Sequence, residues 1–176
     1  RDETGISGSV ASAGALIELE RTSEDELSGT FSQGGATLPL TLVRGNQFAE
    51  IGDAVPDFIV EIDGGELAGT LLLPAGEGPH PAILLLNGSG SQDRDVNVAG
   101  LPVFAVLAES LAQRGIATLR LDDRGIGGSS APAPASPLDL ATDANAAFAA
   151  LRNASGIEAS CTGMLGHSEG AMIAFL

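Results

Sequence analysis

Short apolar or alternating runs, divided by turn-forming residues, fill the first part of the chain. Clusters of Gly, Ser, Asn, Asp and Glu separate four such runs, at residues 6–10, 15–20, 27–31 and 37–43. This close spacing predicts strands joined by turns. The segment 28–42 is predicted to form a hairpin around Gly34-Gly35. We therefore expect residues 1–45 to form a small β module that packs on something else, because it holds no catalytic grouping.

A connector is predicted at residues 46–56. Two further strands, at 58–62 and 67–73, are joined by the tight-turn sequence Asp63-Gly64-Gly65. Residues 74–81 form a predicted loop, and His80 is interpreted as a surface residue of that loop.

From residue 82 onward, continuous apolar runs alternate with runs of helical spacing. The runs at 82–86 and 116–121 predict strands covered on both faces. Apolar residues from Phe104 to Leu111 predict a helix that ends near Gly115. Ser136, with Pro137 and Asp139, marks the start of a second helix. Its expected apolar stripe is Leu140, Ala144, Ala147, Phe148 and Leu151.

The order strand, helix, strand, helix, strand predicts an α/β fold over residues 57–176. Such alternation requires a mostly parallel sheet with right-handed crossovers and helices on both faces. Glycine-rich loops at 87–91, 122–130 and 166–170 follow the three predicted strands. Ligands bind at the carboxyl ends of strands in this class of fold, so one functional site is expected where these loops meet.

The last of these loops has the pattern Gly-x-Ser-x-Gly, from Gly166 to Gly170 with Ser168 at its centre. An apolar lead-in precedes it and a run that could form a helix follows, which is the context of a nucleophile elbow. Glycines two residues before and after Ser168 remove side chains that would clash in a strained turn. The N–H of Glu169 is expected to point at the same space as the serine hydroxyl, near the positive end of the new helix.

Charge and composition exclude several classes of partner. The net charge is −15, with 23 acidic residues, 8 Arg and no Lys, so nucleic acid and anionic membranes are not expected partners. No apolar run is long enough to insert into a membrane. The single cysteine, Cys161, is interpreted as a small core residue. No metal or cofactor is predicted. The chain begins with Arg1, so we expect an N-terminal piece to be missing, and its compartment is unknown from composition.

Four stretches carry a family resemblance: 28–42, Asn87 to Asp95, 119–129 and 166–170. The chain resembles an α/β-hydrolase, and more narrowly the serine esterases and aminopeptidase-like hydrolases with a small N-terminal β domain. Three residues depart from the common pattern. Asn87 stands where many have His, Ser91 where Pro is common, and Ala171 where a further Gly is frequent.

The resemblance implies a role for several residues. Ser168 would be the nucleophile, and the N–H groups of Glu169 and of the 88–90 turn, with Ser89 chosen as donor, would form the oxyanion hole. Asp93, Arg94, Asp123 and Arg124 would brace the loops, and His167 would pack rather than act as base. The family order Ser, acid, His places the other two catalytic residues after the nucleophile. No His follows Ser168, so both are expected beyond Leu176, and this fragment alone is expected to be inactive.

Alternatives remain open at this point. The substrate is expected to be a small-molecule ester, but a peptidase or amidase would use the same machinery. A non-catalytic binding module of the same fold would not need a strained serine turn. The β module could bind carbohydrate, although its lack of Trp and Tyr argues against sugar stacking. The resemblance favours a secreted or extracytoplasmic location.

Overall fold

The computed structural model describes residues 5–43 and 50–176. The chain divides into two compact units, Arg1–Phe48 and Ala49–Leu176.

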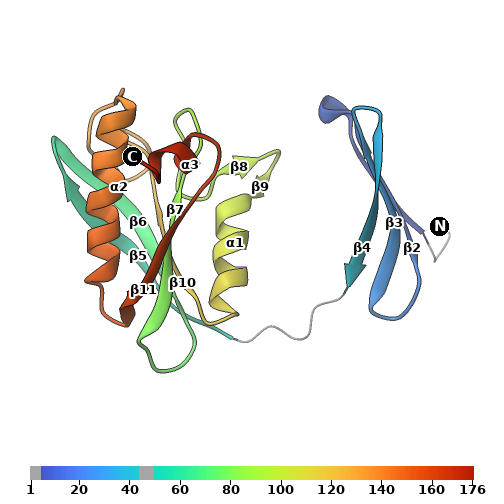
Figure 1. The fold of residues 1–176 in the computed structure, drawn as a ribbon, viewed down its shortest axis with the longest axis horizontal. Coiled ribbons are helices and arrows are strands. Elements are labelled where there is room, and N and C mark those ends of the chain that lie inside the picture. The colour runs from blue at the N-terminus through green and yellow to red at the C-terminus, as the bar shows by residue number, and fades with distance from the viewer. Residues whose placement is uncertain (1–4, 44–49) are drawn as a thin grey trace. The chain divides into compact units, whose positions relative to one another are not determined.

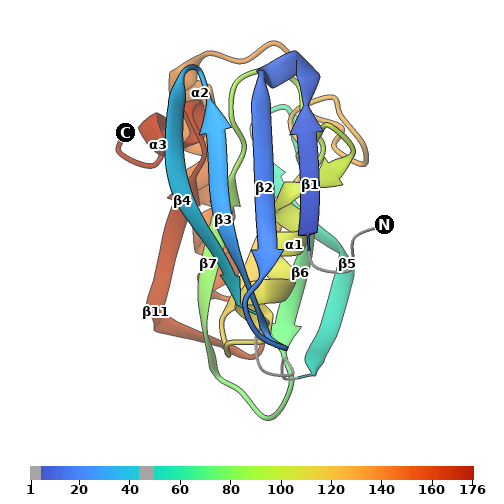
Figure 2. The same ribbon diagram turned by 90° about the vertical axis from the view of Figure 1, so that its right-hand side faces the viewer.

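The first unit is a four-stranded antiparallel sheet in the order β1-β2-β3-β4 (Figure 2). Its strands are β1 (Gly5–Val10), β2 (Ala15–Arg21), β3 (Glu26–Gln33) and β4 (Ala36–Val43), with a 3₁₀ turn at Ala11–Ala13. All four predicted strands are confirmed within two residues at each end. Gly34 and Gly35 form the predicted hairpin turn at φ 60° and 83°, a region that favours glycine.

The second unit is a mixed five-stranded sheet in the order β11-β7-β10-β6-β5. Its strands are β5 (Ile51–Ile62), β6 (Gly65–Pro74), β7 (His80–Leu86), β10 (Ala117–Leu121) and β11 (Ile157–Gly166). Strands β7, β10 and β11 are parallel, whereas β6 is antiparallel to both β10 and β5. A short ribbon of β8 (Asn97–Val98) and β9 (Leu101–Pro102) precedes the first helix.

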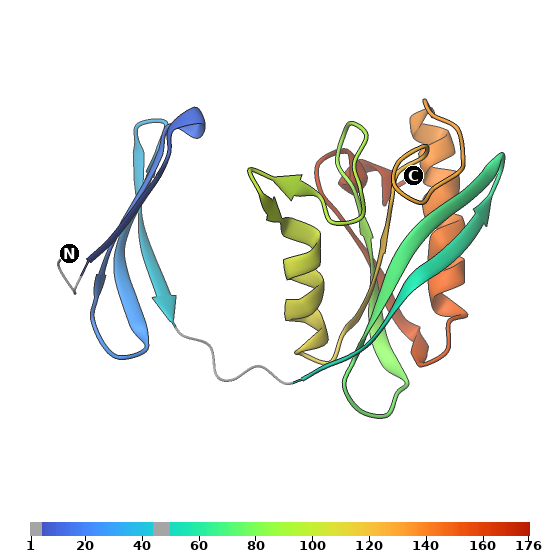
Figure 3. The ribbon, with the colours of Figure 1, turned by 180° about the vertical axis from the view of Figure 1, so that it is seen from behind.

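Helices cover both faces of this sheet, as predicted. Helix α1 (Val103–Ala112) lies on one face, and α2 (Pro137–Arg152) lies on the other (Figures 1 and 3). The reason is topological. The crossover from β7 to β10 runs one way along the sheet and the crossover from β10 to β11 runs back, so right-handed connections place their helices on opposite faces. Helix α3 (Glu169–Ile173) follows β11.

The core forms where β7 and β10 are covered on both faces. Leu84, Leu119 and Leu151 are fully buried there. The start of α2 is confirmed as a capping box: Asp139 N–H donates to Ser136 Oγ at 3.2 Å, and Ser136 N–H donates to Asp139 Oδ2 at 2.8 Å. No helix in the described ranges has the length and apolarity needed to span a membrane.

Three sequence predictions fail where the burial signal is weak. The expected connector at 46–56 is wrong for residues 51–56, which belong to β5, while residues 46–49 lie outside the described residues. This half of β5 is mostly exposed and has register shifts between Ile51 and Ala54 and between Val55 and Phe58, so it shows no regular alternation. His80, expected in a loop, is the half-buried first residue of β7.

The third error concerns β11 and its cysteine. Only Ile157 of β11 is buried, because β11 pairs with β7 alone among the described residues. Cys161, expected in the core, is exposed. Cys161 lies where the register of β11 against β7 shifts, between Ile157 and Thr162. At such an irregularity the regular alternation of side chains between the two faces is lost.

Candidate active site

Ser168 occupies a strained turn between β11 and α3. Its φ of 54° and ψ of −115° lie in a region that L-residues rarely adopt. A Cβ on Gly166 would overlap the carbonyl of Gly170, and a Cβ on Gly170 would overlap Asn87 O. The turn therefore requires glycine at both positions, and the Ser168 side chain is exposed.

The turn that follows β7 packs directly on this strained turn. A Cβ on Gly88 would lie 2.8 Å from Nδ1 of His167, so the imidazole rests against that glycine. The His167 N–H donates to Leu86 O at 3.1 Å. The backbone N–H groups of Ser89 and Glu169 make no hydrogen bond within the described residues, so each remains free to donate to a ligand.

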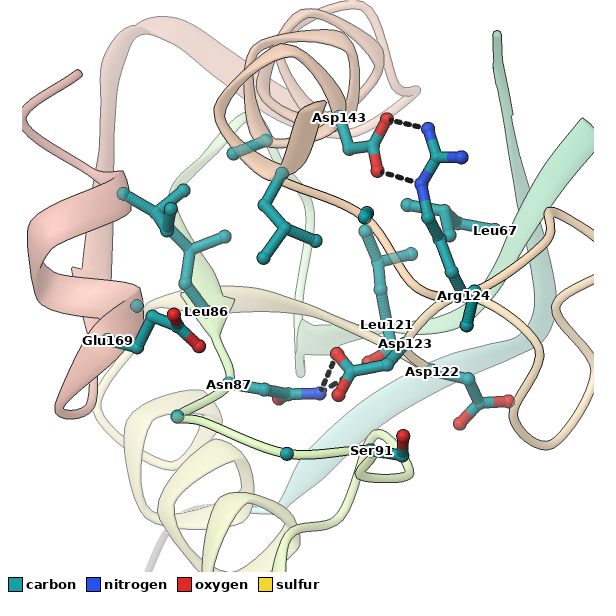
Figure 4. Close-up of a pocket in the computed structure, with 18 of the residues that line it drawn as sticks. Leu67, Leu86, Asn87, Ser91, Leu121, Asp122, Asp123, Arg124, Asp143 and Glu169 are labelled. Atoms are coloured by element: carbon teal, nitrogen blue, oxygen red, sulfur yellow. Dashed lines mark hydrogen bonds and ion pairs between the residues drawn. The ribbon is translucent and has the colours of Figure 1, made fainter. Parts of the chain in front are cut away.

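A cavity of about 300 Å³ opens beside these two turns (Figure 4). Its walls are largely apolar, with leucines from β6, β7 and β10 and Ile173 from α3. Asp123, Asp143 and Glu169 add carboxylates to the lining. Glu169 and Gly170 of the elbow line the cavity, whereas Ser168 and Ser89 do not.

Arg94 and Asp122 form the first of two bidentate ion pairs that brace the loops. Arg94 donates from Nε at 3.0 Å and from Nη2 at 2.7 Å, and its own N–H and that of Gly128 also donate to the carboxylate. Burial alone would raise the pKa of Asp122, but these hydrogen bonds and the Arg94 charge hold that pKa below its usual value. The hydrogen bond to Asp122 raises the pKa of Arg94.

Arg124 and Asp143 form the second pair, at 2.7 and 2.8 Å. The hydrogen bond to Asp143 raises the pKa of Arg124. This pair links the loop after β10 to α2. Of the residues expected to brace loops, Arg94 and Arg124 thus do so through aspartates that the sequence reasoning missed. The sequence does hint at a role for Asp143, because this charged residue falls on the apolar stripe of α2, where a charge needs a partner.

Asp123 has no cationic partner among the described residues. Its carboxylate accepts from Asn87 Nδ2 at 2.9 Å and from Gln92 N–H at 2.8 Å. Burial raises the pKa of Asp123, and the charges of Asp122 and Glu169 add to the rise, against the lowering effect of the two hydrogen bonds. The other expected bracing residue, Asp93, accepts from the N–H groups of Asp95 and Val96 within its own loop.

No protein-family model matches the chain. Esterase EstD of Thermotoga maritima is 38% identical over 58 residues, which are 33% of this chain and 14% of that protein. The solved α/β-hydrolase GrgF from Penicillium sp. sh18 is 22% identical with a TM-score of 0.56, covering 69% of this chain and 39% of its own. The Pyrococcus furiosus esterase Pf2001 is 20% identical with a TM-score of 0.55, covering 72% and 45%.

This chain has the α/β-hydrolase fold. The predicted fold class is confirmed: a partial α/β-hydrolase sheet with helices on both faces follows a small antiparallel β-sheet. The chain spans less than half the length of GrgF and Pf2001, and 14% of the length of EstD.

Within this α/β-hydrolase sheet, the two histidines occupy very different places. His80 begins β7 and pairs with Ile157, whereas Leu86 ends β7 and pairs with Gly166 just before the elbow. The two ends are six residue steps apart along the strand, a distance of about 20 Å. His167 adjoins Ser168, but no hydrogen bond reaches the Ser168 hydroxyl from any described residue. In the described ranges, no group of three His, Cys, Asp or Glu side chains could hold a metal ion.

Proposed function

We propose that this protein is a serine hydrolase that cleaves carboxylic esters through an acyl-enzyme, with Ser168 as the nucleophile. One observation carries the proposal: Ser168 is exposed on a glycine-enforced turn, and the turn after β7, which packs on it through Gly88, has an unused backbone donor at Ser89, as the elbow has at Glu169. The esterase names of the relatives EstD and Pf2001 support an ester as the substrate.

The proposed reaction has two halves. Ser168 Oγ attacks the ester carbonyl and loses its proton to a base, and the tetrahedral intermediate collapses as the alcohol leaves with a proton. Water then attacks the acyl-enzyme in the same way and releases the acid. The base is not His80, which lies at the far end of β7. His167 makes no hydrogen bond to the Ser168 hydroxyl, so neither histidine is positioned as the base, and we expect residues 1–176 alone not to turn over p-nitrophenyl esters.

The N–H groups of Ser89 and Glu169 are proposed to form the oxyanion hole. Negative charge develops on the carbonyl oxygen only as the tetrahedral state forms, so fixed donors stabilise that state over the bound ester. Loss of one such donor typically lowers kcat by roughly 10²–10³-fold. The glycine-only contacts of Gly88 and Gly170 would hold the two donor segments together.

The test is covalent labelling of the full-length protein by a fluorophosphonate. We expect one label on Ser168, absent in Ser168→Ala and retained in Ser160→Ala, which removes an exposed hydroxyl from β11. Labelling that persists in Ser168→Ala would overturn the assignment, and no labelling of the unaltered protein would favour a binding module. Comparing a p-nitrophenyl ester with the p-nitroanilide of the same acid then separates an esterase from an amidase.

A further inference from the structure

The turn between β7 and α1 is held at both of its ends by one carboxylate. Asp123 Oδ1 accepts from the Asn87 side chain at 2.9 Å, and Oδ2 accepts from the Gln92 N–H at 2.8 Å. The Asp123 N–H also donates to Gln92 O at 3.0 Å. Figure 4 shows the first of these contacts, with the Asn87 amide directed at the Asp123 carboxylate.

Few other bonds determine where this turn lies. Between residues 88 and 91, no backbone N–H donates to an acceptor in the described residues. Asn87 also donates to Leu121 O at 3.2 Å, and the Gln92 amide donates to Ser89 O at 3.1 Å within the turn itself. The glycine contacts set how closely this turn approaches the elbow, and the Asp123 hydrogen bonds set where both of its ends lie relative to β10.

Burying the negative charge of Asp123 costs free energy that an arginine offsets at Asp122 and Asp143. Asp122 and Asp143 each face a bidentate arginine, whereas Asp123 faces only uncharged donors and lies near the Glu169 charge. An Asn side chain would accept only one of the two hydrogen bonds, because its NH₂ group would meet a donor at the other. A carboxylate is the group of this size that accepts both.

We infer that Asp123 is a positioning residue, whose two carboxylate oxygens fix the Ser89 N–H in the oxyanion hole. The inference rests on the proposed function, because it assigns a purpose to a donor of that site. Asp123 acts through Asn87 and Gln92 and does not itself contact the ester.

The experiment uses the full-length protein with Asp123→Asn and Asp123→Ala. Asp93→Asn serves as the control, because Asp93 also accepts two hydrogen bonds in this loop, from the N–H groups of Asp95 and Val96 to Oδ1 at 3.0 and 3.1 Å, but none from residues 87–92. Fluorophosphonate titration counts reactive Ser168, so kcat for a p-nitrophenyl ester is expressed per labelled site. Unfolded molecules take up no label, so they do not lower the kcat that is calculated for a variant.

We expect kcat to fall by about 10-fold in Asp123→Asn and about 100-fold in Asp123→Ala, the latter approaching the loss of one oxyanion donor. KM should stay within about 2-fold, because the donor acts on the tetrahedral state and not on the bound ester. The control should keep both constants. An unchanged kcat per site, or a rise in KM alone, would overturn the positioning role. An unlabelled wild-type protein would instead overturn the proposed function.

Discussion

Breaking the Arg94–Asp122 pair should cost the protein a large part of its stability. Arg94→Met keeps most of the side-chain stem but removes Nε and Nη2 from Asp122. It also removes the Nη1 hydrogen bonds to Pro56 O and Thr70 Oγ1, both at 2.9 Å. The Asp122 side chain is 4% exposed and that of Arg94 20%, so water cannot easily replace the lost contacts. Removal of one partner from a buried pair costs about 3–5 kcal/mol.

The assay is urea unfolding of the full-length protein, followed by circular dichroism at pH 7. We expect the free energy of unfolding to fall by about 3 kcal/mol or more in Arg94→Met. The control Arg152→Met, at an exposed position on α2, removes one hydrogen bond, from Nε to Ala159 O at 3.1 Å, and should lower the free energy of unfolding by about 1 kcal/mol or less. Equal losses in the two variants would refute the reasoning from burial.

The difference in the free energy of unfolding between wild type and Arg94→Met should also depend on pH. Because the folded pKa of Asp122 is depressed, its stabilising effect is present above the unfolded pKa of about 3.9 and is lost as pH falls through the folded pKa. The gap measured at pH 7 should therefore shrink in the acid range below about pH 4. A gap that stays constant there would show that lost packing, and not the ion pair, accounts for the effect.

Three further outcomes test separate parts of the structure. Ser136→Ala removes the side-chain acceptor at the start of α2 and should lower the free energy of unfolding by about 1 kcal/mol in the same urea assay; no change would contradict the capping box. Gly170→Ala should abolish fluorophosphonate labelling of Ser168, because the new Cβ would lie 2.5 Å from Leu86 O. Gly163→Ala, whose Cβ would meet nothing within 4 Å, should keep it. Cys161 should react with Ellman's reagent in the folded protein at the rate of a free thiol, and protection until urea is added would contradict its exposure.

Elements with a strong burial signal were predictable from the sequence. The continuous apolar runs of β7 and β10 gave strands within one or two residues, and Ser136 with Asp139 marked the first turn of α2. The first half of β5 and the middle of β11 were misinterpreted because both are largely exposed and irregular in their pairing. Hydrophobic periodicity cannot report a strand that buries neither face.

The candidate site divides in the same way. The spacing of Gly166, Ser168 and Gly170 predicted a strained turn, because the local backbone alone dictates where glycine is needed. The partners of Arg94 and Arg124 were not predictable by spacing, since Asp122 lies 28 residues and Asp143 19 residues along the chain. Such pairs depend on how β10, α2 and the loop after β7 come together, which only the tertiary structure shows.

Strand order explains why the turn after β7 and the turn after β11 must be glycine-rich together. Leu86 and Gly166 end paired parallel strands at the same register, so the two chains leave the sheet side by side. Each turn then occupies the space that a side chain on the other would need: Gly88 meets His167, and Gly170 meets the carbonyls of Asn87 and Leu86. Any Cβ that pushed these turns apart would also separate the N–H groups of Ser89 and Glu169. The close approach of the glycines and the spacing of the two proposed donors are therefore a single physical constraint. A substitution that moves the two turns apart must also change the distance between the two donors.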